Sequence, residues 1–246
     1  MVDLLQSAIH GRAVRNSHAF VVDEIGRAIV TGRYPVGVAL PNDAQLTEQF
    51  GVSRTVLREA MKTLTAKGLV SPRARVGTRV NDRTAWNMFD AHVLAWHLET
   101  GVSPELLGHL TEMRLAFEPH AAGLAARRAT PDDTRRLSAH AERMASATTN
   151  ETFAVADLDF HTTLLAIARN PFLYSVGNLI EVALATSFKL SSPAEDDTLR
   201  SAVAGAHQDI AAAVAAGDDV AAADRTRRVI VMGQERIEQA YRTYRV

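Results

Sequence analysis

The sequence predicts a mainly α-helical protein, in which a few short N-terminal helices end in a small β-hairpin and an all-α helical bundle follows. Three observations predict this class. Apolar residues recur at helical spacing through most of the 246 residues. Prolines follow capping residues where several of these segments begin. Only one short region, around residue 75, has the pattern of two paired strands.

The N-terminal elements are read from their breaks and caps. Asn42 and Gln45 have the spacing of a capping box, Gly51 can end the helix that they begin, and Ser53 can cap the next one. The segments Leu69–Ser71 and Thr78–Val80 flank a basic tip and predict a hairpin. We therefore expect a polar arm over 1–17, helices over 20–30, 42–50 and 53–67, and a hairpin over 69–80.

The C-terminal part is divided by pairs in which a capping residue precedes proline: Ser103-Pro104, Thr130-Pro131, Asn170-Pro171 and Ser192-Pro193. Each pair predicts a helix start, because the first residue can cap a free backbone N–H and proline lacks one. The apolar residues between them step by three and four, and no segment alternates as a strand does. The expected helices span 86–100, 104–128, 131–148, 151–168, 171–190, 196–216 and 219–243.

Charge divides the chain into two parts of opposite character. The formal net charge is −1, but residues 1–84 carry 12 Lys and Arg against 7 Asp and Glu, whereas residues 85–246 carry 15 against 21. The basic part suits a polyanionic partner. The absence of cysteine excludes disulfides, thiolate metal sites and cysteine nucleophiles. Since no apolar stretch could span a bilayer, we expect a soluble, cytoplasmic protein without a membrane partner.

The N-terminal helices follow the helix-turn-helix plan, in which the second helix enters the major groove of DNA. Arg54 and Arg58 are one helical turn apart, and an arginine fork can bind guanine or phosphate. Ser53 and Thr55 at the helix start suit a phosphate, and Arg73 and Arg75 add positive charge from the hairpin. A solvated helix with surface ion pairs and no ligand is the alternative.

This region carries a family resemblance. The stretches Ile25–Gly37, Leu40-Pro41, Leu46–Ala60, Gly68–Val70 and Gly77-Thr78 resemble the winged helix-turn-helix of the GntR family of transcription regulators. The resemblance implies that Ser53, Arg54, Thr55 and Arg58 contact DNA and that Arg73, Arg75 and Gly77 form the wing. The family usually has an arginine where this chain has Asp43-Ala44-Gln45, so the operator preference is expected to differ.

The C-terminal part contains a candidate metal and ligand site. Asp157 and His161 are i,i+4 neighbours on a helix, and His207 lies on an apolar stripe of another. A carboxylate with imidazoles inside a bundle is a composition for Zn, Ni or Mn. Arg114 is the candidate clamp for a carboxylate ligand. Alternatively the three groups hydrogen-bond a ligand or one another, and Arg114 forms a surface salt bridge.

A second resemblance concerns this part. The segments Glu112–Pro119, Asp157–His161 with Ala168–Pro171, and His207–Ile210 resemble the FCD effector domain of the FadR subfamily. In that domain an Asp and three His bind a divalent cation beneath the effector. The third His would fall at Val229, so the resemblance implies weaker metal binding here. Trp86-Asn87, Asp90, Val93-Leu94 and Trp96 further resemble the galactonate-responsive branch, which implies a sugar-acid effector.

Together these observations predict a DNA-binding region over 18–80, a linker with a helix over 81–102, and an effector-binding and dimerisation region over 103–243. We expect a homodimeric regulator, usually a repressor in this family, that a small carboxylic acid releases from a palindromic operator in double-stranded DNA. The most favoured acid is an aldonate. The alternatives are another carboxylate or an acyl thioester as effector and, far below these, a metal-dependent hydrolase or lyase.

Overall fold

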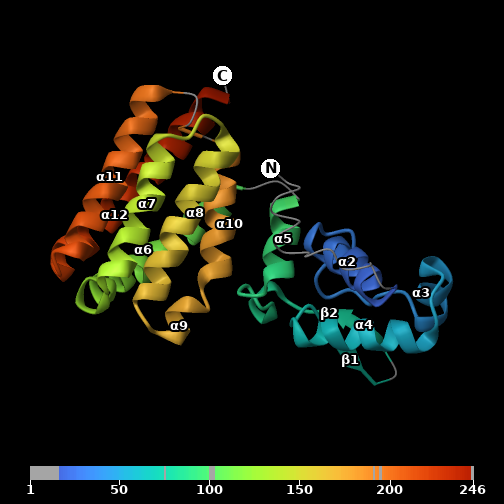
Figure 1. Ribbon diagram of the computed structural model, residues 1–246. Coiled ribbons are helices and arrows are strands. Elements are labelled where there is room, and N and C mark those ends of the chain that lie inside the picture. Colours follow the sequence, from blue (N-terminus) through green and yellow to red (C-terminus); the bar gives the residue numbers. More distant parts are fainter. Residues whose placement is uncertain (1–16, 75, 100–102, 191, 194–195, 245–246) are drawn as a thin grey trace. The chain divides into compact units, whose positions relative to one another are not determined.

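The computed structural model describes residues 17–74, 76–99, 103–190, 192–193 and 196–244. The chain forms two compact units, which divide between Val102 and Ser103. Nearly all described elements are helices, and the one sheet among them has two strands (Figure 1). The predicted fold class, a mainly α-helical chain with one N-terminal hairpin, is confirmed.

The N-terminal unit begins with three helices that enclose a common core. They are α2 (Ser17–Val30), α3 (Asp43–Phe50) and α4 (Arg54–Ala66). The hairpin strands β1 (Val70–Arg73) and β2 (Gly77–Val80) follow, with Val70 opposite Val80 and Arg73 opposite Gly77. A 3₁₀ turn, η1 (Arg83–Ala85), and helix α5 (Ala91–Glu99) complete the unit. The apolar face of each helix and the inner ends of both strands fill the core, as their spacing predicts.

Helix α5 packs on α2 through an aromatic contact that requires a glycine. The indole of Trp96, which is 1% exposed, lies against the backbone of Gly26. A Cβ at position 26 would stand 2.2 Å from a ring carbon of Trp96. The indole N–H of Trp96 donates a 2.7 Å hydrogen bond to Asp23. Just before α5, Lys67 Nζ contacts both carboxylate oxygens of Asp90, at 2.6 and 2.7 Å. The segment that follows the hairpin is therefore fastened to the N-terminal unit at both ends.

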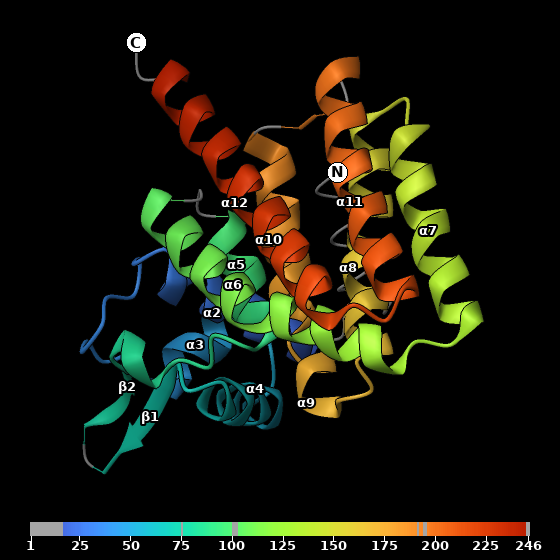
Figure 2. The same cartoon turned by 90° about the vertical axis from the view of Figure 1, so that its left-hand side faces the viewer.

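The C-terminal unit is a helical bundle (Figures 1 and 2). The helices α6 and α12 pack together, α7 packs against α8 and α11, and α10 packs against α8. The core is formed mainly by alanine and large apolar side chains from all of the long helices. The helices are α6 (Pro104–Arg128), α7 (Pro131–Ala145), α8 (Asn150–Ile167), α9 (Pro171–Tyr174), α10 (Gly177–Leu190), α11 (Asp197–Ala215) and α12 (Asp219–Tyr244).

Most of the predicted helix starts in this unit are confirmed. The side chains of Ser103, Thr130 and Asn170 each accept a backbone N–H, and proline follows each of them. The start predicted at Ser192-Pro193 is wrong, because α11 begins at Asp197 and its cap is Asp196. The single helix predicted over 171–190 is also wrong, since it is divided into α9 and α10. No described helix combines the length and the apolar composition that a membrane crossing needs.

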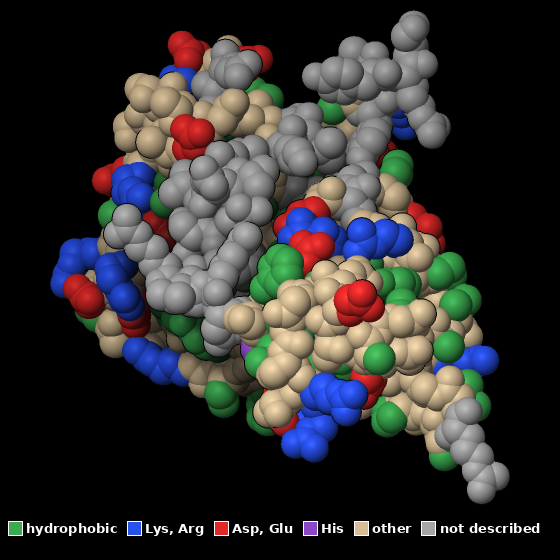
Figure 3. Space-filling model, turned by 90° about the vertical axis from the view of Figure 1, so that its right-hand side faces the viewer, with side chains coloured by type: hydrophobic (Ala, Val, Ile, Leu, Met, Phe, Trp, Pro, Cys, Tyr) green, Lys and Arg blue, Asp and Glu red, His purple; other side chains and the backbone are tan. Residues whose placement is uncertain are grey.

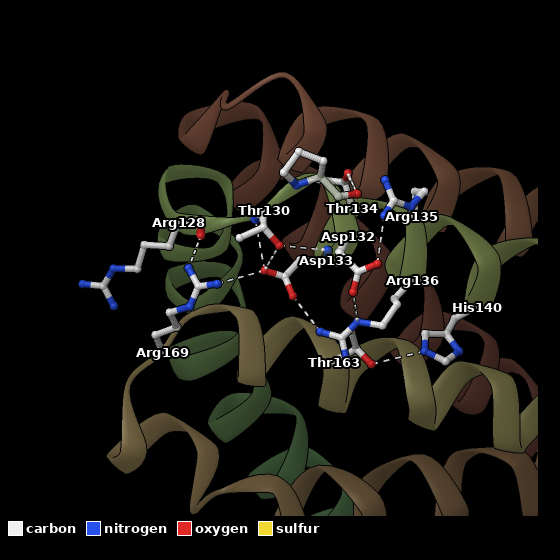
Figure 4. Close-up of polar contacts among 11 residues, drawn as sticks. Arg128, Thr130, Asp132, Asp133, Thr134, Arg135, Arg136, His140, Thr163 and Arg169 are labelled. Carbon is white, nitrogen blue, oxygen red and sulfur yellow. Dashed lines mark hydrogen bonds and ion pairs between the residues drawn. The ribbon is translucent and has the colours of Figure 1, made fainter.

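A polar junction joins the ends of α6, α7 and α8 (Figure 4). Asp133 accepts hydrogen bonds from the backbone N–H of Thr130 at 3.0 Å and from its hydroxyl at 2.8 Å, which completes a capping box for α7. Arg136 and Arg169 also donate to Asp133, at 2.6 and 3.0 Å. Arg128 and Arg169 each donate to a carbonyl at the end of the other's helix. This junction fixes the end of α8, the helix that carries two residues of the candidate site.

Candidate functional site

The turn between α3 and α4 is built by local capping. Asn42 and Gln45 form the predicted capping box, with both bonds at 3.0 Å. Gly51 ends α3 with φ +63°, a conformation that side chains other than glycine rarely adopt. The Ser53 hydroxyl accepts the backbone N–H of Val56 and caps α4. The helix-turn-helix is therefore defined by the residues that the sequence indicated, and the Ser53 side chain is engaged as a cap.

Helix α4 presents an apolar face to the core and a basic face to solvent. Leu57, Ala60 and Leu64 are buried, whereas Arg54 and Thr55 in the first turn are exposed. The side chain of Arg58, one turn later, is 72% exposed and lies 3.9 Å from Glu59. At that distance and exposure the pair restrains Arg58 little. These side chains can therefore reach a polyanion without unfolding any part of the core.

The hairpin extends the exposed polar surface beside α4. Arg73 on β1 and Arg79 on β2 are exposed, and Gly77 begins β2 with φ +94°. The predicted wing residue Arg75 lies outside the described residues. On the face shown in Figure 3, Lys and Arg side chains are interspersed with Asp and Glu. The basic side chains that share one element and one direction are those of α4.

In the C-terminal unit, the structure brings Asp157, His161 and His207 together in the bundle interior. Asp157 and His161 come from α8 and His207 from α11, and none is more than 3% exposed. His207 Nε2 lies 3.2 Å from Asp157 Oδ1 and 3.4 Å from His161 Nε2. One ligand atom from each of the three residues falls within 4.8 Å of the others. This is a group that could hold a metal ion.

The hydrogen-bond partners of the two imidazoles indicate which nitrogens carry lone pairs. His207 Nδ1 lies 2.8 Å from the carbonyl oxygen of Val203, which can only accept, so the proton is on Nδ1. His161 Nδ1 lies 2.5 Å from Glu118 Oε2, and a carboxylate also only accepts. Both Nε2 atoms then point lone pairs toward Asp157. Three lone-pair atoms that converge in a buried site repel one another unless a cation lies among them, so the donor set fits a divalent cation.

The electrostatics of Asp157 agree with this arrangement. Burial raises the pKa of its carboxyl, but His207, His161 and Arg114 together outweigh burial and lower it. Asp157 is therefore ionised and available as a ligand at neutral pH. Its second oxygen, Oδ2, has no hydrogen-bond partner among the described residues.

Arg114 is buried and pairs with Glu118, a residue that the sequence analysis missed. Its Nε lies 2.5 Å from Glu118 Oε1, and its NH2 lies 3.5 Å from His161 Nε2. Burial raises the pKa of Glu118, but Arg114 and His161 outweigh it and hold the pKa at about 2. Glu118 is 1% exposed, and the available signal was its i,i+4 spacing from Arg114. Arg114 is thus no surface salt bridge.

A partly open cavity of about 440 Å³ lies over this group. Arg114, Asp157, His161 and His207 line one part, and apolar side chains line another: Leu184, Phe188, Val203, Val229 and Met232. Arg236 of α12 also lines it, and sequence reasoning missed this residue because no motif included it. Burial lowers the pKa of Arg236, with Arg114 adding to that effect and Asp157 opposing it. Val229 occupies the cavity wall where the resemblance placed a third histidine.

An exposed basic recognition helix with a hairpin, joined in one chain to a bundle with a buried ligand cavity, defines a DNA-binding transcription regulator with a sensor domain. Comparison with known families agrees. Residues 18–80 match the model described as bacterial regulatory proteins, gntR family, and residues 109–231 match the FCD domain. The chain belongs to the GntR family of bacterial transcription regulators. Its domains and relatives are regulators and not enzymes.

Two curated relatives and one solved structure illustrate the similarity. The uncharacterized HTH-type transcriptional regulator YieP of Escherichia coli K12 is 36% identical over 72% of this chain and 78% of its own. The galactonate operon transcriptional repressor of the same organism is 38% identical over 62% of this chain and 67% of its own. A structure described as that of Lar, which controls the Listeria monocytogenes agr system, covers 94% of this chain and 99% of its own. Its TM-score is 0.62 at 22% identity, which supports the fold alone.

Proposed function

We propose that this chain is a homodimeric repressor of the FadR subfamily that binds a palindromic operator and is released by a small carboxylic acid. The DNA contacts are assigned to Ser53 and Thr55 at the start of α4, to Arg54 and Arg58 on its exposed face, and to the wing, with Arg73, Arg75 and Gly77. Two-fold protein symmetry matches two inverted half-sites. Because its partner is DNA, the proposed site of action is the cytoplasm.

The acid is proposed to bind in the cavity of the C-terminal unit, above a divalent cation of the Zn, Ni or Mn class. Asp157, His161 and His207 would hold the cation, which supplies positive charge to an anionic ligand. The observation that supports this assignment is the convergence of two imidazole lone pairs and a carboxylate in a buried space. Three protein ligands leave coordination positions open for the acid.

Charge around the cavity explains why cation and acid should bind together. With neutral imidazoles, Arg114 and Arg236 balance Glu118 and Asp157, so the site has no net charge. A divalent cation raises the net charge to about +2 and makes the site favourable for an anion. Arg114 is engaged with Glu118, so the acid's carboxylate is assigned to the cation and to Arg236 together with the outer edge of Arg114.

An aldonate is the first candidate effector, since its hydroxyls suit the polar part of the cavity and the galactonate repressor is among the relatives. The apolar part, with Leu184, Phe188 and Val229, favours a second candidate, a carboxylic acid with a short alkyl chain. In either case the acid favours an arrangement of the two DNA-binding units that no longer fits the half-site spacing. Linkage then requires DNA to weaken acid binding by the same factor.

The experiment is a selection of bound duplexes from a random DNA pool with the full chain, followed by titration of acids against the selected site. We expect an inverted repeat, affinity that falls steeply with salt, and release by a sugar acid such as galactonate. A panel with short alkyl acids and an acyl thioester separates the candidates. Failure to select any sequence at any acid concentration would contradict the proposed DNA-binding function.

A further inference from the structure

We propose that Glu118 is a positioning residue that fixes the tautomer of His161 and thereby presents its Nε2 lone pair to the metal site. This inference rests on the proposed function, because it assigns a role beside the proposed cation site. Glu118 is not itself a ligand of that site. It acts through His161, from the opposite side of the imidazole ring.

The contact between the two residues carries the proposal. Glu118 Oε2 lies 2.5 Å from His161 Nδ1, and both side chains are 1% exposed. Water does not compete for a pair buried to this degree. A carboxylate offers no proton at neutral pH, so the contact is favourable only when Nδ1 carries one. In the neutral ring Nε2 is then the lone-pair nitrogen, and it faces His207 Nε2 at 3.4 Å.

Arg114 keeps Glu118 in place. Its Nε and NH2 lie 2.5 and 3.4 Å from the two oxygens of the same carboxylate. The i,i+4 spacing of the two residues on α6 sets this geometry within a single helix. The guanidinium therefore orients the carboxylate, and the carboxylate orients the imidazole. Outer partners of this kind commonly determine how strongly a histidine binds metal.

His207 provides an internal comparison, because its orientation depends on the backbone. Its Nδ1 contacts the carbonyl oxygen of Val203, one turn earlier on α11. No side chain is needed to fix that tautomer. Loss of the carboxylate at position 118 should thus affect His161 and leave His207 as it was.

A different role for Glu118 would be simply to neutralise the buried charge of Arg114. That role predicts a loss of stability on substitution, with no effect on the histidine tautomers. The two roles are therefore distinguished by the state of the His161 ring. Stability alone cannot separate them, since both predict that a substitution destabilises the bundle.

The test compares Glu118→Gln with the wild-type chain, both as full-length protein labelled with ¹⁵N in its nine histidines. The side-chain amide can accept or donate, so it no longer imposes one tautomer. Glu112→Gln is the matched control, because Glu112 lies on the same helix and is exposed. Ring nitrogen shifts are recorded without metal at about pH 8, well above the ordinary histidine pKa of about 6.5. Zn²⁺ affinity is then measured by competition with a chelator.

We expect His161 to be protonated on Nδ1 in the wild type and in Glu112→Gln, and to populate both tautomers in Glu118→Gln. We also expect Glu118→Gln to bind Zn²⁺ roughly 10- to 100-fold more weakly, with the His207 signals unchanged. A wild-type His161 that carries its proton on Nε2 would overturn the inference, even if the variant does not fold. So would a folded Glu118→Gln with wild-type tautomers and Zn²⁺ affinity. If the wild type binds no Zn²⁺, the proposed metal site fails, and the tautomers still decide the role of Glu118.

Discussion

The contact between Gly26 and Trp96 predicts a large effect from a very small substitution. In Gly26→Ala the new Cβ would lie 2.2 to 2.6 Å from three carbons of the Trp96 ring, where ordinary contacts begin at 3.4 Å. The ring must therefore move by roughly 1 Å, which costs about 1–3 kcal/mol in a packed core. The 2.7 Å bond from the indole to Asp23 is lost with it, at about 1–3 kcal/mol.

Part of this cost is offset, because alanine favours a helix over glycine by about 1 kcal/mol. The net expectation is a destabilisation of the N-terminal unit by about 3 kcal/mol, or a fall in its Tm of roughly 10–20 °C. Both tryptophans of the chain, Trp86 and Trp96, lie in this unit. Thermal unfolding followed by tryptophan fluorescence therefore reports on it selectively. Gly205→Ala, at an exposed helical glycine with nothing within 4 Å, is the control. A Tm of Gly26→Ala within about 2 °C of the wild type would refute the reasoning.

Three further substitutions test other parts of the account. Arg58→Ala should weaken operator binding by about 1–3 kcal/mol and, if Arg58 contacts phosphate, lower the salt slope by about 1; Arg135→Ala, equally exposed in the C-terminal unit, should change neither in a salt titration of DNA binding. His207→Ala should weaken Zn²⁺ binding by more than about 100-fold, whereas His120→Ala, at an exposed histidine of α6, should not, as measured by chelator competition. Asp133→Ala should lower the stability of the C-terminal unit by about 1–2 kcal/mol through loss of the α7 cap, as followed by circular dichroism. The Asp133 pKa is lowered to about 2, so its contribution is complete above the unfolded value of about 3.9 and is lost as the pH falls toward 2; acid unfolding that is the same with and without Asp133 would contradict this.

The sequence predicted the helices and the hairpin well because their signals are local. The capping box at Asn42 and the caps at Ser103, Thr130 and Asn170 each involve residues within one turn. The error at Ser192-Pro193 has the same origin. A second capping residue, Asp196, stands four positions later, and local chemistry does not decide between the two.

The candidate site was predictable only where its residues announce a ligand chemistry. Asp157 and His161 share a helical face, and His207 stood out on an apolar stripe. Glu118 did not stand out, because the apolar spacing of α6 placed the buried face on Leu106, Met113 and Phe117. The structure buries Leu107, Arg114 and Glu118 instead. Two charged residues that satisfy each other can occupy core positions, and a search for apolar residues alone overlooks them.

Arg236 was missed for a different reason. It lies 29 positions after His207, near the end of α12, and only the packing of α12 on α6 brings it to the cavity. No spacing rule connects residues on different helices. Side chains that meet through tertiary packing are therefore beyond what one sequence can indicate.

The most direct test of the central claim is a calorimetric titration of galactonate, and of a short alkyl acid, into the full chain with Zn²⁺ and after chelation. The account predicts binding of at least one acid that is at least tenfold tighter with the metal, because the cavity without a cation has no net charge to attract an anion. Binding of equal affinity in the two states, or no binding of either acid to the Zn²⁺-loaded protein, would contradict it.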